Sequence, residues 1–248
     1  MPVALLTGAA GGLGVATARR LAQDGYRVVV TDRTPGSRLD DLAAEVGGAA
    51  LAADLADPAA ARRLVGEVEE RTGGIDVLVA NHAYMTMAPV EEHDPDDWWR
   101  VVDTNLGGTF ALAQAVAGPM TRRGSGRIVV ICSEWGVVGW PGATAYSASK
   151  AGLVALVKSL GRELAPAGVV VNGIAPGVVD TPQLQVDADA AGLTLAAMHA
   201  EYARDIPLGR IGRPEEIAAA VAFLASPRVG ALVGQVLQLN GGSTRTRA

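Results

Sequence analysis

The sequence predicts an α/β fold in which helices cover both faces of a doubly wound, parallel sheet of seven strands. Seven short apolar runs alternate with helical stretches, and this order places successive strands parallel through right-handed crossovers. The runs are apolar throughout instead of alternating with polar residues, which is typical of strands buried on both faces. We expect strands at residues 3–6, 27–31, 50–55, 75–80, 127–132, 169–174 and 235–239.

Helical periodicity fills the segments between these strands. Pro58 lies in the first turn of one helix, where its missing N–H costs nothing, and Gly168 follows the end of another. Residues 178–208 show no strand periodicity and are interpreted as an insertion. No change of composition marks a linker, so residues 1–248 are expected to form a single domain. The predicted helices are residues 15–23, 39–46, 58–71, 95–120, 146–164 and 214–224.

The composition excludes several classes of function. Of the 248 residues, 49% are hydrophobic and 19% are charged, which supports a large core and argues against disorder. A formal net charge of −5 disfavours a nucleic-acid surface. Cys132 is the single cysteine, and it shares no metal-ligand spacing with the three histidines. Without an apolar run of 18 residues or a signal-peptide pattern, we expect a cytoplasmic protein that uses no metal and no membrane.

A glycine cluster follows the first strand and opens the first helix. Glycines let the backbone approach a pyrophosphate closely, and the N-terminus of a helix directs free N–H groups at its oxygens. The spacing, T-G-x-x-x-G-x-G, differs from the G-x-G-x-x-G pattern of many dinucleotide-binding Rossmann folds. A glycine-rich turn without a ligand is the alternative. We predict that the cofactor contacts here are Gly8, Gly12, Leu13 and Gly14.

An acidic residue closes the second strand where a ribose ligand is expected. Asp32 lies eighteen residues after Gly14, so its carboxylate can accept hydrogen bonds from the adenosine ribose hydroxyls. A 2′-phosphate would meet a like charge there, which favours NAD over NADP. The neighbouring Arg33 would offset part of this repulsion. Asp54 and Leu55, at the end of the third strand, are candidates for the adenine edge, although an aspartate between a strand and a helix also has a purely structural explanation.

Tyr146 and Lys150 form a Tyr-x-x-x-Lys pair on the face of one predicted helix. A free tyrosine, with a pKa near 10, is too weakly acidic to act as a base at neutral pH. A nearby ammonium group favours the phenolate and lowers that pKa. The phenolate can then take the proton of an alcohol while hydride leaves its carbon. A Tyr/Lys pair on a solvated helix face is common, so the pair alone is weak evidence.

Together these features resemble the short-chain dehydrogenase/reductase family over essentially the whole chain. Ser133 stands thirteen residues before Tyr146, at the position of the family's catalytic serine, and Asn105 begins an Asn-Leu-Gly-Gly match to its asparagine motif. The resemblance implies that Ser133 hydrogen-bonds the substrate oxygen. It also implies that Lys150 binds the nicotinamide ribose and that Asn105 holds a water linking Lys150 to solvent.

The resemblance implies further cofactor contacts around the carboxyl ends of the strands. Thr181 is expected to contact the nicotinamide carboxamide, and Asn81 and Ala83 to support the adenosine side. The chain departs from the family where His82 and Tyr84 replace an asparagine and a glycine. For His82 a structural role is favoured over a functional one. The remaining contacts expected after the sixth strand are Pro176, Gly177 and Val179.

The aromatic residues suggest what the substrate is. The chain has only ten, and four of them fall on segments expected to border the reacting centre. This pattern favours an apolar, cyclic or aromatic substrate, and residues 183–206 are interpreted as its lid. Alternatively, the two tryptophans pack at a subunit contact, and Glu134 either binds a substrate hydroxyl or faces solvent. The candidate substrate contacts are Ser133, Tyr146, Glu134, Trp135, Trp140 and Tyr84.

We therefore expect an NAD-dependent dehydrogenase that interconverts a secondary alcohol and a ketone, running towards oxidation. One alternative is an NADPH-dependent carbonyl reductase of a biosynthetic pathway, against which Asp32 argues. Another is a nucleotide-binding sensor without catalysis, against which the complete Ser133, Tyr146, Lys150 and Asn105 set argues. The resemblance also implies a homotetramer, with the helices at about 95–120 and 146–164 pairing across one interface and the last helix and strand across another.

Overall fold

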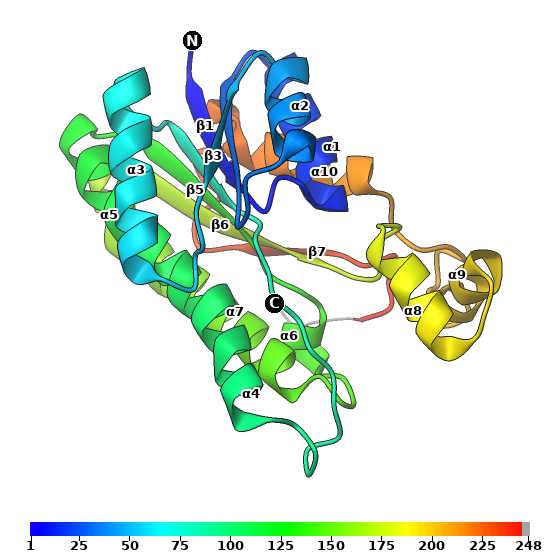
Figure 1. Ribbon diagram of the computed structural model, residues 1–248. Helices are drawn as coiled ribbons and strands as arrows, with labels where there is room; N and C mark the ends of the chain where they lie inside the picture. The colour runs from blue at the N-terminus through cyan, green and yellow to red at the C-terminus, as the bar shows by residue number, and fades with distance from the viewer. Residues whose placement is uncertain (245–248) are drawn as a thin grey trace.

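A single parallel sheet of seven strands, in the order β3-β2-β1-β4-β5-β6-β7, forms the centre of the computed structural model (Figure 1). The structure describes residues 1–244. The order reverses between β1 and β4, as in doubly wound sheets, so the predicted fold class is confirmed. The strands are β1 (Val3–Thr7), β2 (Arg27–Asp32), β3 (Ala49–Ala52), β4 (Val77–Ala80), β5 (Gly126–Ile131), β6 (Val169–Pro176) and β7 (Val236–Leu239).

Helices pack on both faces of this sheet (Figure 1). One buried cluster joins α3, α5 and α7 to one face, and a second joins α1, α2 and α10 to the other. The helices are α1 (Gly12–Gln23), α2 (Ser37–Glu45), α3 (Pro58–Thr72), α4 (Pro95–Val102), α5 (Gly108–Arg123), α6 (Trp135–Val138), α7 (Thr144–Leu164), α8 (Gln183–Ala191), α9 (Leu195–Ala203) and α10 (Pro214–Ala225).

The two-sided core explains why the strands are apolar throughout. Successive side chains of a strand point to opposite faces of the sheet. In β1, Val3 and Leu5 belong to the cluster under α3, α5 and α7, whereas Ala4 and Leu6 belong to the cluster under α1, α2 and α10. All four are buried, so apolar side chains are favoured on both faces of the strand.

The prediction of one continuous helix over residues 95–120 is wrong, because the structure divides this segment. The structure has α4, then a five-residue π-helical turn at Asp103–Gly107, and then α5, which runs past Pro119 to Arg123. A π turn inserts an extra residue into the helical repeat and is frequent at functional sites. Periodicity does not reveal it, because the apolar spacing resumes on the far side. Its centre is the candidate catalytic residue Asn105.

The insertion expected at residues 178–208 folds as a helical unit of its own. Helices α8 and α9 lie apart from the sheet, beyond its carboxyl edge (Figure 1). Five buried side chains form a small separate core there: Leu184, Ala188, Met198, Ile206 and Ile211. A single parallel bridge between Val179 and Gly212 joins the two ends of the insertion. The Leu208 N–H also donates to the Gly241 carbonyl at 3.0 Å, so this bond, the bridge and a minor core hold the unit, which suits a segment that covers a site.

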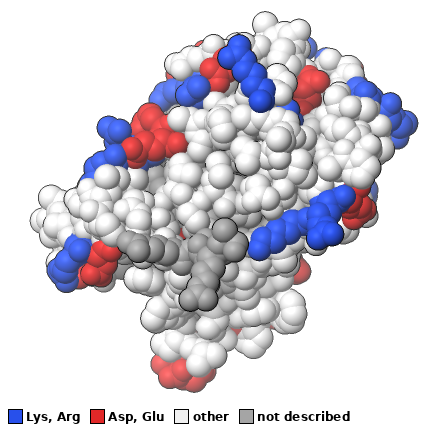
Figure 2. Space-filling model, turned by 180° about the vertical axis from the view of Figure 1, so that it is seen from behind, with Lys and Arg blue, Asp and Glu red and all other residues white. Residues whose placement is uncertain are grey.

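The surface carries both signs of charge. On the face seen in Figure 2, acidic and basic side chains lie near one another around the edge, with a broad uncharged area between them. Among residues 1–244, no helix is both long and apolar enough to cross a membrane. The same residues contain no group of three or more His, Cys, Asp or Glu side chains that could hold a metal ion.

Candidate active site

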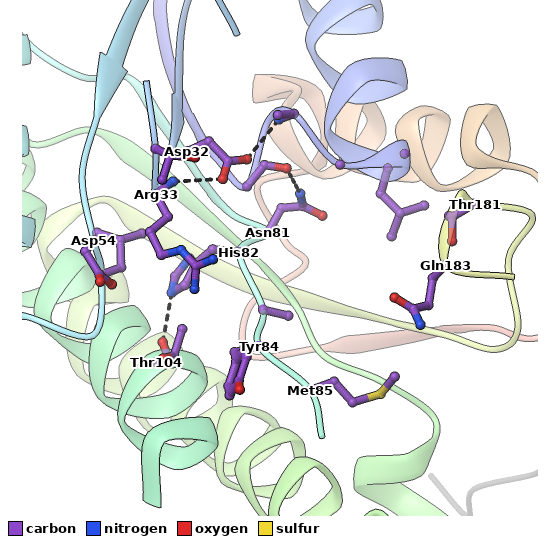
Figure 3. A pocket seen from close by; sticks show the side chains of 18 of the residues that line it. Asp32, Arg33, Asp54, Asn81, His82, Tyr84, Met85, Thr104, Thr181 and Gln183 are labelled. Atoms are coloured by element: carbon purple, nitrogen blue, oxygen red, sulfur yellow. Dashed lines mark hydrogen bonds between the residues drawn. The ribbon is translucent and has the colours of Figure 1, made fainter. Parts of the chain in front are cut away.

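A cavity of about 700 Å³ opens at the carboxyl edge of the sheet, where β1, β2 and β4 end (Figure 3). Asp32, Arg33 and Asp54 stand on one side of it, and Thr181 and Gln183 on the other. This large cavity is lined by Gly8, Ala10, Gly11, Gly12, Leu13, Asp32, Arg33, Thr34, Arg38, Ala53, Asp54, Leu55, Asn81, His82, Ala83, Tyr84, Met85, Arg100, Thr104, Tyr146, Thr181, Pro182 and Gln183.

The glycine loop forms one wall of the large cavity and requires its glycines. Gly8 has a φ of +61°, and a Cβ there would lie 2.7 Å from the Cα of His82. A Cβ on Gly14 would lie 2.3 Å from the carbonyl oxygen of Gly8. The N-cap of α1, Gly11, has no side chain to bind the first N–H groups of the helix. Those N–H groups are available to an anion, so the loop fits a dinucleotide pyrophosphate.

Asp32 is held in a fixed orientation beside that loop. Its Oδ2 accepts a hydrogen bond from the N–H of Ala10 at 3.0 Å, and its Oδ1 accepts one from the N–H of Arg33 at 2.8 Å. A carboxylate has about four acceptor positions, so capacity remains for ribose hydroxyls. Arg33 and Arg38 line the same cavity, which brings two guanidinium groups to the region where only Arg33 was expected.

Asn81 and His82 tie the glycine loop to the end of β4. The Asn81 amide donates to the carbonyls of Thr7 and Gly8, at 3.1 and 3.0 Å. The His82 ring contacts Thr7 Oγ1 through Nδ1 and the Thr104 carbonyl through Nε2, at 2.8 and 3.1 Å. A carbonyl only accepts, so Nε2 carries the proton. Burial, reinforced by the charge of Lys150, lowers the pKa of His82 to about 4. The ring is neutral and supports the loop, which agrees with the favoured structural role.

Asn105 clamps the segment that carries Tyr84. Its Oδ1 accepts from the N–H of Tyr84 at 2.7 Å, and its Nδ2 donates to the Tyr84 carbonyl at 2.9 Å and to Ser149 Oγ at 3.0 Å. Its own main-chain carbonyl accepts from Thr109 Oγ1. The side-chain amide is thus engaged by protein groups, and the water relay implied by the resemblance stays a prediction.

A smaller cavity of about 160 Å³ adjoins the large one. Met85, Tyr146, Thr181 and Gln183 line both, so Tyr146 lies where the two cavities meet. Residues of α8 and α9 close one side, in the place expected for a lid. The lining residues of the small cavity are Met85, Ser133, Glu134, Trp135, Tyr146, Gly177, Val178, Val179, Thr181, Gln183, Leu184, Asp187 and Tyr202.

Of the predicted Ser133, Tyr146 and Lys150 set, Ser133 and Tyr146 meet at this junction, whereas Lys150 lies beside the Tyr146 ring and lines neither cavity. Lys150 is fully buried; its Nζ lies 5.5 Å from the centre of the Tyr146 ring and donates to the carbonyl of Ile131 at 2.8 Å. Burial lowers the pKa of Lys150 to about 8. Burial also raises the pKa of Tyr146 to about 12, although the Ser133 side chain acts against this rise. The expected lowering by Lys150 is therefore not seen in the protein alone, where its ammonium group faces Ile131.

The predicted substrate contacts divide into two groups. Trp135 packs edge-on against Tyr146 at 5.9 Å, and it lines the small cavity together with Ser133 and Glu134. Trp140 stacks on the outer side of Trp135 at 5.0 Å, lines neither cavity and is 46% exposed. Its expected substrate contact is therefore not supported, because Trp135 stands between.

Tyr84 lines the large cavity instead of the small one. Its hydroxyl donates to Asp97 at 2.8 Å, and the Arg100 guanidinium lies 4.6 Å from the centre of its ring. These contacts hold the phenol near the nucleotide side, so the structure does not place it among the residues that line the small cavity. Pro176 lines neither cavity; its carbonyl accepts the N–H of Glu134 at 2.9 Å and thereby positions that residue.

Several lining residues were not expected from the sequence. Arg38, Met85, Arg100, Asp187 and Tyr202 all face one of the two cavities. Arg38 and Arg100 lie on α2 and α4, which follow the strands β2 and β4. No motif spacing marks either arginine as a site residue. Asp187 and Tyr202 reach the site only because the insertion folds back over it.

This arrangement defines a class of protein. An α/β sheet with a glycine loop at its switch point and a Ser/Tyr/Lys set beside it is that of a nicotinamide-dependent oxidoreductase. A family described as enoyl-(acyl carrier protein) reductase matches residues 8–244. The chain belongs to the short-chain dehydrogenase/reductase family.

Similar proteins of known function span almost the same length as this chain. A cis-4-hydroxycyclohexanecarboxylate dehydrogenase of Sinomonas cyclohexanicum is 39% identical over 98% of this chain and 96% of its own. The short-chain reductase protein NovJ of Streptomyces niveus is 39% identical over 97% and 93%. The 3-oxoacyl-[acyl-carrier-protein] reductase FabG of Thermotoga maritima is 36% identical over 97% and 96%.

Proposed function

We propose that this protein is an NAD-dependent dehydrogenase that interconverts a secondary alcohol and a ketone on a compact, mainly apolar ring. The observation that carries the proposal is the position of Tyr146. It joins a large cavity suited to a dinucleotide with a small cavity that also holds Ser133. A reacting carbon bound in the small cavity is therefore next to both the proton acceptor and the cofactor site.

The residues of the site divide the chemistry between them. A nicotinamide cofactor, when bound, accepts or supplies the hydride. Gly8, Gly12 and Leu13 with the N-terminus of α1 would hold its pyrophosphate, and Asp32 its adenosine ribose. Gly14 lines neither cavity and instead allows the close packing of the loop against α1. In the small cavity the Ser133 hydroxyl hydrogen-bonds the substrate oxygen and stabilises its developing charge. Tyr146 takes the hydroxyl proton during oxidation and returns it during reduction.

Lys150 makes this proton transfer possible at neutral pH. With a pKa near 8 it is mostly charged at pH 7. A positive charge close to the phenol favours the phenolate. Lys150 is the residue that would supply this charge, and it would also hold the nicotinamide ribose of a bound cofactor. Asn105 belongs to the π turn and donates to Ser149 on α7. It thereby ties that turn to the helix that carries Tyr146 and Lys150.

Asp32 is the residue that favours NAD, and two arginines are the residues that would favour NADP. Asp32 disfavours a 2′-phosphate, whereas Arg33 and Arg38 line the same cavity and would bind one. Isothermal titration of NAD⁺ and NADP⁺ into the wild type, Asp32→Ala and Arg38→Ala tests the choice. We expect tighter binding of NAD⁺ that Asp32→Ala weakens. Tighter binding of NADP⁺ that Arg38→Ala abolishes would favour an NADPH-dependent reductase instead.

The small cavity indicates the size of the substrate. Its 160 Å³ is well below the roughly 300–1,000 Å³ of pockets for drug-sized ligands, which favours one ring over a long chain. Apolar side chains of Met85, Trp135 and Leu184 form much of its wall. The Sinomonas relative is named for a substituted cyclohexane, which supports the same class of substrate. A panel of cyclic and linear secondary alcohols, followed by absorbance of the reduced cofactor, tests this; turnover confined to linear alcohols would contradict it.

We also propose that the enzyme is a cytoplasmic homotetramer. Large apolar side chains stand exposed on the helices expected to pair, including Trp99 on α4 and Phe110 on α5, at 58% and 47% exposure. Exposed apolar groups of this size on neighbouring helices suit a subunit interface. Light scattering behind a sizing column measures the mass, and a monomer would contradict this proposal without touching the catalytic one.

A further inference from the structure

Glu134 brings a carboxylate into the small cavity directly beside the reacting centre. It follows Ser133, lines the same cavity, and is only 7% exposed. A carboxylate buried in a mainly apolar cavity is costly unless it is hydrogen-bonded. The sequence alone is compatible with a Glu134 that faces solvent, and the burial of this side chain excludes that alternative.

The protein fixes this side chain and makes room for it. Ser243, after β7, donates a hydrogen bond from Oγ to Oε2 of Glu134 at 2.5 Å. The other oxygen, Oε1, lies next to Gly177, where an added Cβ would come within 3.1 Å of it. A Cβ there would also come within 2.8 Å of Asn240, so the glycine leaves space for Asn240 and for Oε1. Burial raises the pKa of Glu134, whereas its contacts with Ser243 and Asn240 lower it, so a further donor would stabilise the ionised form.

The rest of the small cavity offers an anion no positive charge. Among its lining residues there is no lysine, arginine or histidine, and Asp187 adds a second carboxylate. A carboxylate on the substrate would meet like charges in a space of low polarity, which is unfavourable. A hydroxyl or ammonium group would instead find an acceptor.

We propose that Glu134 is a specificity-determining residue that accepts a hydrogen bond from a second donor group on the substrate ring. The inference rests on the proposed dehydrogenase function and narrows it: the substrate is a cyclic diol or amino alcohol, held at its reacting oxygen by Ser133 and Tyr146 and at its second donor by Glu134. The substrate in the name of the Sinomonas relative carries a carboxylate in place of such a donor.

Initial rates on a matched set of six-membered rings test the proposal. The probes are cyclohexanol, the 1,2-, 1,3- and 1,4-cyclohexanediols, 4-aminocyclohexanol and 4-hydroxycyclohexanecarboxylate. A hydrogen bond to a charged group contributes enough for an advantage of about 10- to 100-fold. We expect at least one diol or the amino alcohol to exceed cyclohexanol in kcat/KM by that factor, mainly through a lower KM, and the carboxylate to be the poorest. The diol and amine arms distinguish a hydroxyl from an ammonium donor.

Glu134→Gln keeps the size of the side chain and removes its charge. We expect this variant to lose most of the advantage of the favoured probe, to raise its KM more than it changes kcat, and to improve the carboxylate probe. Glu163→Gln, on the exposed side of α7, is the matched control and should leave every ratio unchanged. Thermal melting shows whether Glu134→Gln folds; if it does not, the wild-type series decides by itself.

The outcomes separate the two proposals. Turnover of cyclohexanol with no advantage for any probe that carries a second donor overturns the role of Glu134 and leaves the dehydrogenase intact. An advantage that survives unchanged in a folded Glu134→Gln variant also overturns it. No turnover of any alcohol or ketone with either cofactor overturns the proposed function and the inference together.

Discussion

Lys150 and Tyr146 lie one helical turn apart on α7, yet the ammonium group of Lys150 donates to the Ile131 carbonyl and stands 5.5 Å from the centre of the tyrosine ring. Burial favours the neutral form of both groups: it lowers the pKa of Lys150 to about 8 and raises that of Tyr146 to about 12. The pair is thus poised for a proton transfer that needs a further positive charge or a shift of Lys150.

The lowered pKa of Lys150 predicts a pH-dependent contribution to stability. Between pH 8 and the ordinary pKa of 10.5, the unfolded chain binds this proton more strongly than the folded one, so the contribution of Lys150 to stability rises with pH. Tyr146 and Cys132, whose pKa values are raised to about 12, act in the opposite sense above pH 9. The comparison with Lys150→Met isolates the lysine.

We expect the free energy of unfolding of the wild type, relative to Lys150→Met, to increase by about 1–3 kcal/mol from pH 7.5 to pH 10. Urea unfolding at a series of pH values, without cofactor, measures it. A difference that stays constant with pH would show that Lys150 keeps an ordinary pKa in the folded protein.

The clamp made by Asn105 predicts a stability and binding defect when it is removed. Asn105→Ala leaves the N–H and carbonyl of Tyr84 without their partners and should cost about 2–4 kcal/mol in unfolding free energy. The cofactor should bind more weakly because Tyr84 lines the large cavity. Tyr84→Phe is the control: it removes only the contact with Asp97 and should cost less than about 1 kcal/mol. Equal effects of the two changes would refute the clamp.

Two glycine substitutions test the close packing of the phosphate loop. In Gly14→Ala the new methyl group would meet Gly8 and Ala9, at 2.3 and 2.6 Å, so we expect a loss of about 1–3 kcal/mol or more and weak cofactor binding. Gly66→Ala, within α3, meets nothing within 4 Å and should gain about 0.5–1 kcal/mol. Thermal melting and cofactor titration compare them, and a well-folded Gly14→Ala with normal affinity would contradict the structure of the loop.

The order of elements was predictable because buried parallel strands carry an unmistakable apolar signature, and the Gly8 to Gly14 loop and the Tyr146 pair follow from spacing. The π turn at Asn105 was not, since it does not disturb the apolar period. Nor was the burial of Glu134, which depends on Ser243, more than a hundred residues away. Sequence spacing predicts a lowered pKa for Tyr146, whereas burial raises it, because the spacing shows that Lys150 is near but not where its ammonium group points.

Tyr146 is the residue that transfers the proton in the proposed reaction. Tyr146→Phe keeps the ring that packs against Trp135 and removes only the hydroxyl. Steady-state turnover of the best ring alcohol, with cofactor affinity measured by titration on the same sample, tests the claim most directly. We predict that kcat falls by about 10²- to 10⁴-fold while the Kd of the cofactor changes less than about threefold. A kcat near that of the wild type in a variant that binds cofactor normally would contradict it.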